Sequence, residues 1–568
     1  MKEILTPNAL TVLGKRYLKK DSSGNAAEGP EDMFRRVAAN IASAESAYGH
    51  PSKKAEEEFY EMMTSLEFLP NSPTLMNAGR KLQQLAACFV LPIEDSIESI
   101  FKAVRDTAVI HQSGGGTGFS FSRLRPANDT VESTGGMASG PISFMRVFNT
   151  ATEAIKQGGT RRGANMGVLS VHHPDIRAFI TAKDDPKEFA NFNLSVSITE
   201  EFMRALRSGE PYPLTNPHTG KISAMADAAE MFSLIATSAW KGGEPGILFI
   251  DAINTVNPTP RQGAMEATNP CGEQPLLPYE ACNLGSINLS RMLKKSPGRE
   301  WSMDFDKLAR TVHTAVRFLD NTIDMCKYPL QEIDKTVRGN RKIGLGVMGF
   351  ADMLIRLGIP YGSEASLSTA EEVMGFINKT AKKASASLAK ERGAYPSCEA
   401  GHGARNATVT TIAPTGTLSI IAGCSSGIEP LYALSYDRRA LGNITLHEMT
   451  PLLEEALFDE GFLKEEILKH VREGKGLGER PDVPEKIKRL FVTAEGISPD
   501  DHVRVQAAFQ RHTDNAVSKT VNLSSASTPE DVMRVYLLAY ELGCKGITVY
   551  RSRSRTEQVL SCKDTPYC

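Results

Sequence analysis

Short β-rich runs alternate with amphipathic helical stretches along this chain, from about residue 70 to about residue 550. Such alternation is typical of α/β folds, in which largely parallel strands form a buried sheet that helices cover. Because no linker interrupts the alternation, we predict one closed, barrel-like body. The predicted strands are 118–124, 166–171, 193–199, 246–250, 284–289 and 407–413, and the predicted helices are 141–156, 224–241, 306–326 and 368–391.

We expect this body over residues 66–550. Three segments of the chain have a different pattern. Residues 1–65 are predicted to be helical, because apolar positions recur three and four residues apart between Met33 and Ala47. Residues 450–498 carry many Glu/Lys pairs and are expected to form a helical excursion with solvated faces. Residues 551–568 are polar and aperiodic, which predicts a mobile tail.

The composition excludes several classes of protein. The chain has 568 residues and a formal net charge of −2, so no overall basic field favours binding to nucleic acid. It contains no apolar run near the roughly 18–20 residues that span a bilayer and no signal-peptide pattern at its start. We therefore predict a cytoplasmic protein that binds neither nucleic acid nor membrane. Its nine cysteines fit neither a disulfide scaffold nor a zinc ribbon, and we predict no metal-ligating set.

The heptapeptide NPCGEQP, residues 269–275, is the most informative segment. Its prolines restrict the backbone and its glycine permits a tight bend, which predicts a rigid projecting loop. Side chains two residues apart on such a loop can face the same way, so Asn269, Cys271 and Glu273 could act on one small ligand. The alternative is a turn that happens to contain a cysteine.

Two further patterns allow both a functional and a structural interpretation. Residues 405–413 form a β-branched run that leads through Pro-Thr-Gly-Thr, 414–417, to an apolar run. A strand, a short loop and a helix start in this order favour an anion site, although an ordinary helix cap has the same pattern. Residues 344–349 match the GxGxxG spacing, but charged residues precede them, so we do not predict a dinucleotide site.

Several blocks together resemble the signature blocks of ribonucleotide reductases, in that family's order, from about residue 69 to residue 551. The resemblance implies a ten-stranded α/β barrel with a central finger loop that carries a radical cysteine. It also implies an enzyme that reduces ribonucleotides to 2′-deoxyribonucleotides. The blocks are LPNSPTLMNAG, AACFVLP, SGGGTGFSFSRLRP, QGGTRRGANMGVLSVHHPDI, NPCGEQPL, CNLGSINL, RKIGLGVMGFADML and APTGTLSIIAGCSSGIEPLY.

The same resemblance implies roles for five catalytic residues. Cys271 matches the cysteine that carries the thiyl radical and abstracts the ribose 3′-hydrogen. Glu273 matches the general base on the 3′-hydroxyl, and Asn269 matches the amide that orients the ribose. Cys88 and Cys282 match the pair that helps to expel the 2′-hydroxyl as water and closes to a disulfide. This pairing requires Cα atoms within roughly 4.4–6.8 Å of one another.

Binding and control residues follow from the same matches. The substrate, a ribonucleoside di- or triphosphate, would contact one group of residues, and a deoxynucleotide (dNTP) effector would contact a second group. A third group would relay the identity of the effector, while helices over 97–112 and 141–157 would form a homodimer interface. The first group is Ser72, Ala87, Thr415, Gly416 and Thr417, the second Asp95, Ser96, Ile97 and Arg125, and the third Gly159, Thr160, Arg161 and Arg162.

The source of the radical is predicted from a late block, GITVYRSRSR, which contains the single tyrosine Tyr550. Reductases with a metal-bearing partner present two adjacent tyrosines there, and the sequence shows no glycyl-radical motif. The block looks most like the adenosylcobalamin-dependent class, whose cofactor contains cobalt. The alternative is the large subunit of a two-component enzyme. Cys562 and Cys568 could pass electrons from a thioredoxin-like reductant, or the tail could be truncated.

Overall fold

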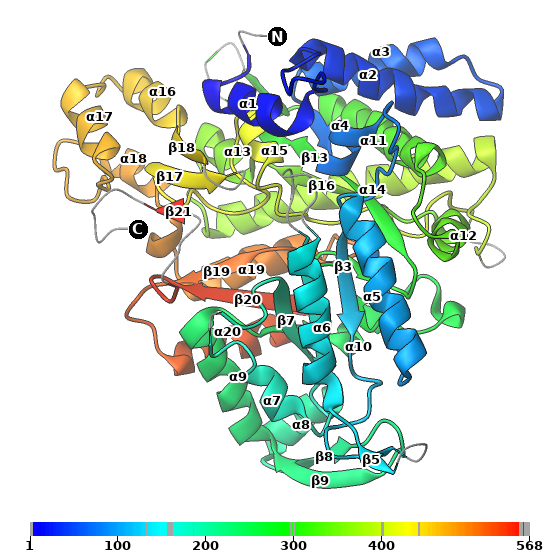
Figure 1. Cartoon of the computed structure of the whole chain (residues 1–568). Coiled ribbons are helices and arrows are strands. Elements are labelled where there is room, and N and C mark those ends of the chain that lie inside the picture. The colour runs from blue at the N-terminus through cyan, green and yellow to red at the C-terminus, as the bar shows by residue number, and fades with distance from the viewer. Residues whose placement is uncertain are drawn as a thin grey trace.

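The molecule is built around a closed sheet of strands, with helices on its outer surface and a helical layer over one end (Figure 1). The coordinates come from a computed structural model of the chain. Among the described residues, no helix combines the length and apolarity needed to cross a membrane. The described residues are 4–131, 135–155, 163–185, 187–295, 298, 301–398, 403–440, 444–555 and 560–561.

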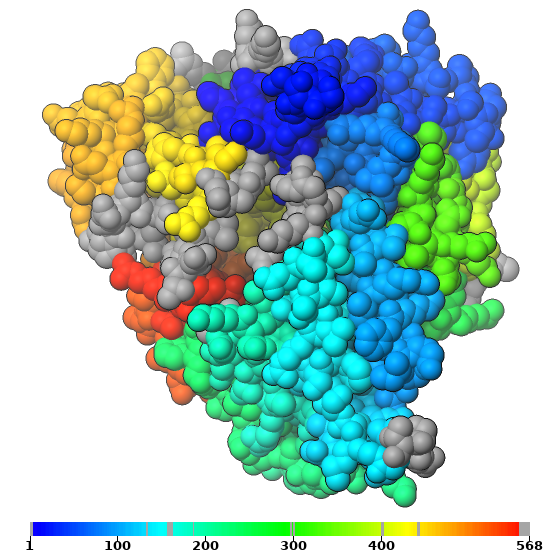
Figure 2. All heavy atoms as spheres, in the orientation of Figure 1, coloured from blue at the N-terminus to red at the C-terminus, as the bar shows by residue number. Residues whose placement is uncertain are grey.

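The helical layer at the N-terminal end contains α1 (Pro7–Val12), α2 (Pro30–Ala42) and α3 (Ser52–Thr64). The apolar face of α2 is buried, as the periodicity of the sequence predicted. In α3, Phe59 packs edge-on against Phe318 of the barrel domain, with ring centroids 5.0 Å apart. This layer appears in blue at one end of the molecular surface in Figure 2.

One half of the barrel consists of five strands that are parallel to one another. These are β2 (Cys88–Val90), β3 (Gly116–Ser120), β6 (Asn165–Ser170), β7 (Phe192–Ile198) and β10 (Gly246–Phe249). In β3, β6, β7 and β10, all residues but one are buried or half-buried, as expected of a parallel sheet covered by helices.

The other half contains β13 (Ala281–Asn288), β16 (Ile343–Met348), β19 (Thr520–Leu523) and β20 (Gly546–Arg551). Within this half β13 is parallel to β16, and β19 is parallel to β20. The two halves meet in antiparallel pairs, β2 with β13 and β10 with β20. The sheet order is β1-β13-β2-β3-β6-β7-β10-β20-β19, with β16 beside β13.

The predicted strand 407–413 fills the remaining gap between β16 and the start of β19. It forms isolated parallel bridges, Leu345 with Thr410 and Ile412 with Val517, rather than a continuous ladder. The Thr411 hydroxyl of this segment donates to a loop inside the barrel. With this segment and the nine strands of the sheet other than β1, the predicted ten-stranded α/β barrel is confirmed.

Helices cover the barrel at the places that the sequence predicted, with one correction. The helix predicted over 224–241 begins later, as α9 (Ala228–Gly242), because β9 (Ile222–Asp227) occupies the preceding residues. Asp227 ends that strand and caps the helix, since its carboxylate accepts from the Glu230 N–H at 2.9 Å. The other covering helices are α5 (Ile97–Gln112), α6 (Gly140–Ala154), α11 (Phe305–Met325) and α14 (Glu364–Arg392).

The charged segment 450–498 is helical, with α16 (Leu452–Asp459), α17 (Glu465–Arg472) and α18 (Glu485–Leu490). These helices share a small hydrophobic core of their own, separate from the main core. They lie beside the N-terminal layer, in yellow and orange, in Figures 1 and 2.

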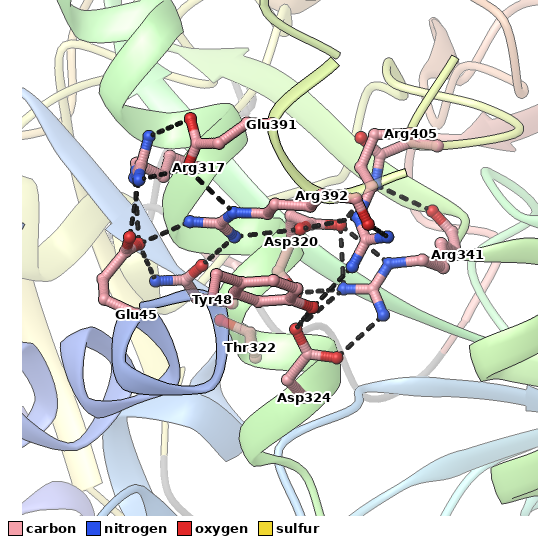
Figure 3. A network of polar contacts seen from close by, with 12 residues as sticks. Glu45, Tyr48, Arg317, Asp320, Thr322, Asp324, Arg341, Glu391, Arg392 and Arg405 are labelled. Carbon is pink, nitrogen blue, oxygen red and sulfur yellow. Dashed lines mark hydrogen bonds and ion pairs between the residues drawn. The ribbon is translucent and has the colours of Figure 1, made fainter. Parts of the chain in front are cut away.

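A network of buried charges ties the N-terminal layer to the barrel helices (Figure 3). Asp320 of α11 is fully buried and forms ion pairs with Arg341, Arg392 and Arg405 at 2.9–3.2 Å. Arg392 also pairs with Glu45 of the N-terminal layer at 2.7 Å. Because each charge has partners, the network can remain in the interior, and it fixes the position of Arg341 shortly before β16.

Shorter elements complete the fold. They are η1 (Leu13–Tyr17), η2 (Ser43–Tyr48), β1 (Phe68–Pro70), α4 (Ser72–Asn77), β4 (Thr130–Val131), β5 (Gly136–Met137), α7 (Ile176–Ile180), α8 (Glu200–Ser208), β8 (Pro211–Thr215), α10 (Ile250–Thr255), η3 (Pro260–Gln262), β11 (Ala267–Thr268), β12 (Pro275–Leu276), η4 (Leu289–Arg291), β14 (Leu293–Lys295), β15 (Trp301–Met303), α12 (Gln331–Asn340), α13 (Phe350–Leu357), α15 (Leu418–Ala422), β17 (Ser435–Ala440), β18 (Ile444–Met449), η5 (Ala494–Gly496), α19 (Pro499–Gln510), α20 (Pro529–Glu541) and β21 (Leu560–Ser561).

Candidate active site

The predicted projecting loop is the tip of a hairpin formed by β11 and β12, with Thr268 opposite Pro275. Two hydrogen bonds close the tip: the Asn269 N–H donates to the Gln274 carbonyl at 3.2 Å, and the Gln274 N–H donates to Asn269 Oδ1 at 2.9 Å. Gly272 has φ +82°, which glycine adopts without strain. The loop is therefore a short, internally braced finger.

Glycines on β3 allow this finger to lie inside the barrel. A Cβ atom on Gly118 would lie 1.8 Å from the Thr268 carbonyl oxygen, and one on Gly116 would lie 3.0 Å from the ring of Pro270. Any larger residue at position 118 would displace the hairpin. Gly116 and Gly118 thus serve close packing, and the strand that was predicted over 118–124 spans Gly116–Ser120.

Cys271 is exposed at the tip of the finger. It lines a cavity of about 1380 Å³, together with Pro270 and Gly272 of the loop. The Asn193 side chain, from β7, donates to the Pro270 carbonyl at 2.7 Å and holds the loop against the opposite wall. The thiol therefore has a fixed position and open space in front of it.

Cys88 and Cys282 lie directly opposite one another on β2 and β13, although 194 positions separate them in the sequence (282 − 88). Facing residues of an antiparallel pair have Cα atoms about 4.5–5.5 Å apart, which is within the range that a disulfide bridges. Asn269 Nδ2 donates to Cys88 Sγ at 3.1 Å, so the finger touches this pair. Burial raises the pKa of the Cys282 thiol well above its usual range.

Glu273 of the finger is buried, only 2% exposed. Its backbone carbonyl accepts from the Thr411 hydroxyl at 2.8 Å and from the Ala516 N–H at 3.0 Å. The charge of Glu273 contributes to the raised pKa of Cys282, so the two side chains are close enough to interact. The finger and the facing strands thus gather three thiols, one amide and one carboxylate in the centre of the barrel.

The residues predicted to bind substrate lie on three different segments of the chain. Thr415 is buried with φ +52°, and its hydroxyl accepts from the Gly427 N–H at 2.7 Å, which shapes the loop that contains Gly416 and Thr417. Ala87 directly precedes Cys88 on the chain, and its N–H donates to the Cys282 carbonyl at 3.4 Å.

Ser72 begins α4, and its hydroxyl lies 2.7 Å from the Tyr17 hydroxyl of the N-terminal layer.

The residues predicted to bind an effector meet at the start of α5. Arg125 Nε donates to Asp95 Oδ2 at 2.7 Å, and the Arg125 N–H donates to Asp95 Oδ1 at 3.1 Å. The Ser96 hydroxyl caps α5 by accepting from the Ser99 N–H at 3.1 Å, while the Ile97 side chain is exposed. Gly159, Thr160, Arg161, Arg162, Cys562 and Cys568 lie outside the described residues.

Some groups at the site were not predicted from the sequence. Tyr432 and Tyr436 line the same cavity as Tyr550, with the rings of Tyr432 and Tyr436 5.4 Å apart. Lys342 and Glu280 form a buried ion pair next to Cys282. Of these groups, only Glu280 could have been predicted to lie near Cys282, because it precedes that cysteine by two residues in a β-rich run. The other contacts depend on the fold.

Comparison with known families gives two matches that together span nearly the whole chain. Residues 4–83 match the all-alpha domain of ribonucleotide reductase, and residues 86–401 and 399–550 match the barrel domain of ribonucleotide reductase. The chain belongs to the ribonucleotide reductase family. The predicted family resemblance is confirmed by these matches.

Relatives in the family support the match along the full length. The chain is 49% identical to the vitamin B12-dependent ribonucleoside-diphosphate reductases of Thermoplasma acidophilum and Mycobacterium tuberculosis (strain CDC 1551 / Oshkosh). The alignments cover 98% and 97% of this chain and 80% of each relative. The fold resembles the Actinobacillus ureae class Id ribonucleotide reductase alpha subunit, with a TM-score of 0.80, 23% identity and coverage of 97% of this chain and 98% of that one.

Proposed function

We propose that this chain reduces ribonucleoside diphosphates to 2′-deoxyribonucleoside diphosphates by thiyl-radical chemistry at Cys271. One observation carries the proposal: an exposed thiol on a braced finger faces a large cavity, with Cys88, Cys282 and Glu273 gathered around the same finger. The diphosphate, rather than the triphosphate, is proposed because the relatives at 49% identity are named ribonucleoside-diphosphate reductases.

Each group around the finger has chemistry that suits one step. Cys271 takes the ribose 3′-hydrogen, because S–H and activated C–H bonds are of similar strength. Glu273 accepts the proton of the 3′-hydroxyl, and Asn269 orients the sugar through its amide. Cys88 and Cys282 supply two electrons and two protons, so the 2′-hydroxyl leaves as water and the two sulfurs form a disulfide. The in-register position of these two cysteines supports that step.

We propose adenosylcobalamin as the source of the radical, as in the relatives named vitamin B12-dependent. When bound, this cofactor supplies an unpaired electron through homolytic cleavage of its cobalt–carbon bond. The cavity fits a ligand of this size, because its volume of about 1380 Å³ exceeds the roughly 300–1,000 Å³ of ordinary ligand pockets. Pro414, Ser426 and Thr548 line this cavity together with Cys271 and would face the cofactor.

Substrate phosphates and a dNTP effector are assigned to separate places. Thr415, Gly416 and Thr417, with Ser72 and Ala87, would contact the nucleotide. Asp95, Ser96, Ile97 and Arg125 would bind the effector at the start of α5, with residues 159–162 as the relay.

We also propose a homodimer built on α5 and α6, which lie side by side on one face of the barrel (Figure 1). Exposed apolar side chains on α5, namely Ile97, Phe101 and Val109, support this interface.

Each turnover leaves a disulfide that must be reduced, and a thioredoxin-like reductant, with Cys562 and Cys568 as relays, would perform that step. The need for reduced thiols favours the cytoplasm. We also propose the domain limits that the sequence predicted, namely 1–65, 66–550 with the helical excursion 450–498, and 551–568.

One turnover assay tests the proposal. The chain is incubated with adenosylcobalamin, a dithiol, a ribonucleoside diphosphate and each dNTP in turn, with no second protein, and deoxynucleotide is measured. Product is expected, and Cys271→Ala, the matched control, is expected to give none. If product forms only after a metal-bearing second protein is added, the large-subunit alternative is correct. If only the triphosphate is reduced, the substrate assignment is wrong.

A further inference from the structure

Three polar side chains of the β17–β18 hairpin, Tyr436, Arg438 and Glu448, line the same cavity as Cys271. Tyr436 and Arg438 are two positions apart on β17, and Glu448 of β18 lies directly opposite Tyr436. Side chains two residues apart on a strand, and those opposite them on the partner strand, share one face. The hairpin therefore presents these three side chains together.

The hairpin has a fixed place in the molecule. Strand β17 is the central strand of a three-stranded sheet, between β18 and β21. The Asn8 side chain of the N-terminal layer donates to the His447 carbonyl of β18 at 2.7 Å. Leu446, also on β18, is buried in the main hydrophobic core. A side chain of this hairpin can therefore hold a neighbouring loop in position.

Glu448 and Tyr436 fix the guanidinium of Arg438. Arg438 Nε lies 2.9 Å from Glu448 Oε1, and Nη2 donates to Glu448 Oε2 at 3.1 Å. Nη2 also donates to the Tyr436 hydroxyl at 2.9 Å, and this hydroxyl donates in turn to Glu448 Oε2. Burial raises the pKa of Tyr436, so the hydroxyl keeps the proton that this bond needs. A planar guanidinium held along one edge by a carboxylate has a defined orientation.

The other edge of the guanidinium reaches the loop that we propose as the phosphate site. Arg438 Nη1 donates to the Gly416 carbonyl at 3.0 Å. In a planar trans peptide the carbonyl oxygen and the following N–H point in opposite directions. Because Arg438 holds the Gly416 carbonyl towards the hairpin, the Thr417 N–H points away from it. Backbone N–H groups at such a loop are the groups that bind phosphate.

Hydrogen bonds, rather than tight packing, determine the shape of this loop. The Thr415 hydroxyl accepts from the Gly427 N–H at 2.7 Å, and the Ser419 hydroxyl donates to the Gly416 carbonyl at 3.3 Å. A Cβ atom on Gly416 would meet no atom within 4 Å. The bond from Arg438 therefore has a large share in fixing the peptide between Gly416 and Thr417.

We infer that Arg438 is a positioning residue for the substrate phosphates, because it holds the Gly416–Thr417 peptide in the orientation that presents the Thr417 N–H to them. This inference rests on the proposed function, which assigns the phosphates to this loop. Glu448 compensates the charge of Arg438, so the contribution is geometric and not a charge attraction. It needs the arginine fork, since the single nitrogen of lysine cannot join Glu448 and Gly416 in the same way.

Binding of cytidine diphosphate to the full chain, measured by equilibrium dialysis without adenosylcobalamin, tests the inference independently of turnover. Arg438→Met is expected to weaken binding roughly tenfold to a hundredfold, the size of one or two lost hydrogen bonds to a charged group. Arg438→Lys should restore only part of the affinity. The matched control, Arg439→Met, removes the same charge from the exposed neighbour on the other face of β17 and should bind like the wild type. Thermal unfolding shows that each variant is folded.

Turnover gives a second measurement. With adenosylcobalamin, Arg438→Met should raise KM by the same factor and leave kcat within about twofold, because it removes binding that the ground state and the transition state share. Glu448→Gln should raise KM less, and should add little to Arg438→Met, since both changes act through one contact. A fall in kcat at unchanged KM, or an equal effect of Arg439→Met, would overturn the inference.

A variant of the loop itself separates this inference from the proposed function. Thr417→Pro removes the N–H that we assign to phosphate. If Thr417→Pro weakens binding of cytidine diphosphate and Arg438→Met does not, the inference is wrong and the phosphate loop stands. If neither weakens it, the phosphates bind elsewhere, and the loop assignment falls together with the inference. If both weaken it but the wild type forms no deoxynucleotide, the proposed reaction fails and the inference stands.

Discussion

Replacement of Gly118 by alanine is expected to slow turnover about a hundredfold while the chain remains folded. The new Cβ would lie 1.8 Å from the Thr268 carbonyl oxygen, and real contacts of this kind are not shorter than 3.0 Å. The hairpin that carries Cys271 must therefore retreat by about 1.2 Å, the difference between these two distances. A misplacement of about 1 Å in a reacting group costs roughly 10²-fold in rate, or about 2.7 kcal/mol in the activation free energy.

A graded series of variants makes this prediction specific. Gly116→Ala places its Cβ 3.0 Å from the Pro270 ring and should have a smaller effect, and Gly242→Ala, with no atom within 4 Å, should have almost none. The assay is kcat with saturating substrate, beside thermal unfolding, where overpacking at position 118 should cost about 1–3 kcal/mol. Wild-type turnover in a folded Gly118→Ala variant would refute the argument that these glycines position the finger.

Three other perturbations have clear expected outcomes. Cys271→Ala should abolish deoxynucleotide formation and leave the midpoint of thermal unfolding unchanged, because the thiol is exposed at a loop tip. Asp320→Asn should lower the free energy of unfolding by about 3–5 kcal/mol in denaturant titrations, because it leaves buried arginines without their counter-charge. Hydrogen bonds from Arg317, Asn321 and Arg392 hold the pKa of Glu45 at about 2, against burial and below its ordinary 4.5. Its stabilising contribution should therefore be complete above about pH 4.5 and lost as the pH falls towards 2, and the difference in unfolding free energy between Glu45→Gln and the wild type should shrink over that range.

The barrel could be predicted from the sequence because its strands are short apolar runs between amphipathic helices. The prediction was less accurate where residues serve two purposes. Gly116 is the first residue of β3, although a glycine at this position is more typical of a loop. A glycine is needed here because a Cβ atom would come close to Pro270 of the finger, and not because the chain turns. The sequence 224–227 has the apolar content of a helix, but Asp227 ends a strand and caps the helix that follows.

Most residues of the site could be identified only from the family resemblance or from the pairing of strands that are far apart in the sequence. Nothing in the spacing of Cys88 and Cys282 indicates that they face each other, since their contact exists only when β13 returns antiparallel to β2. Lys342 lies 60 positions from Cys282 (342 − 282), and its charge gave no reason to expect a buried position, whereas the register of β16 buries it beside the thiol. In contrast, the finger loop was predictable from its own prolines and glycine, because its shape is determined locally.

The central claim is that the thiols at 88, 271 and 282 act on one nucleotide at the finger. A single turnover of fully reduced chain with adenosylcobalamin and a ribonucleoside diphosphate, without added reductant, tests it most directly. Mass spectrometry of the alkylated chain is expected to find one Cys88–Cys282 disulfide for each deoxynucleotide formed, and neither product in Cys271→Ala. Deoxynucleotide formed while both cysteines remain reduced would contradict the account.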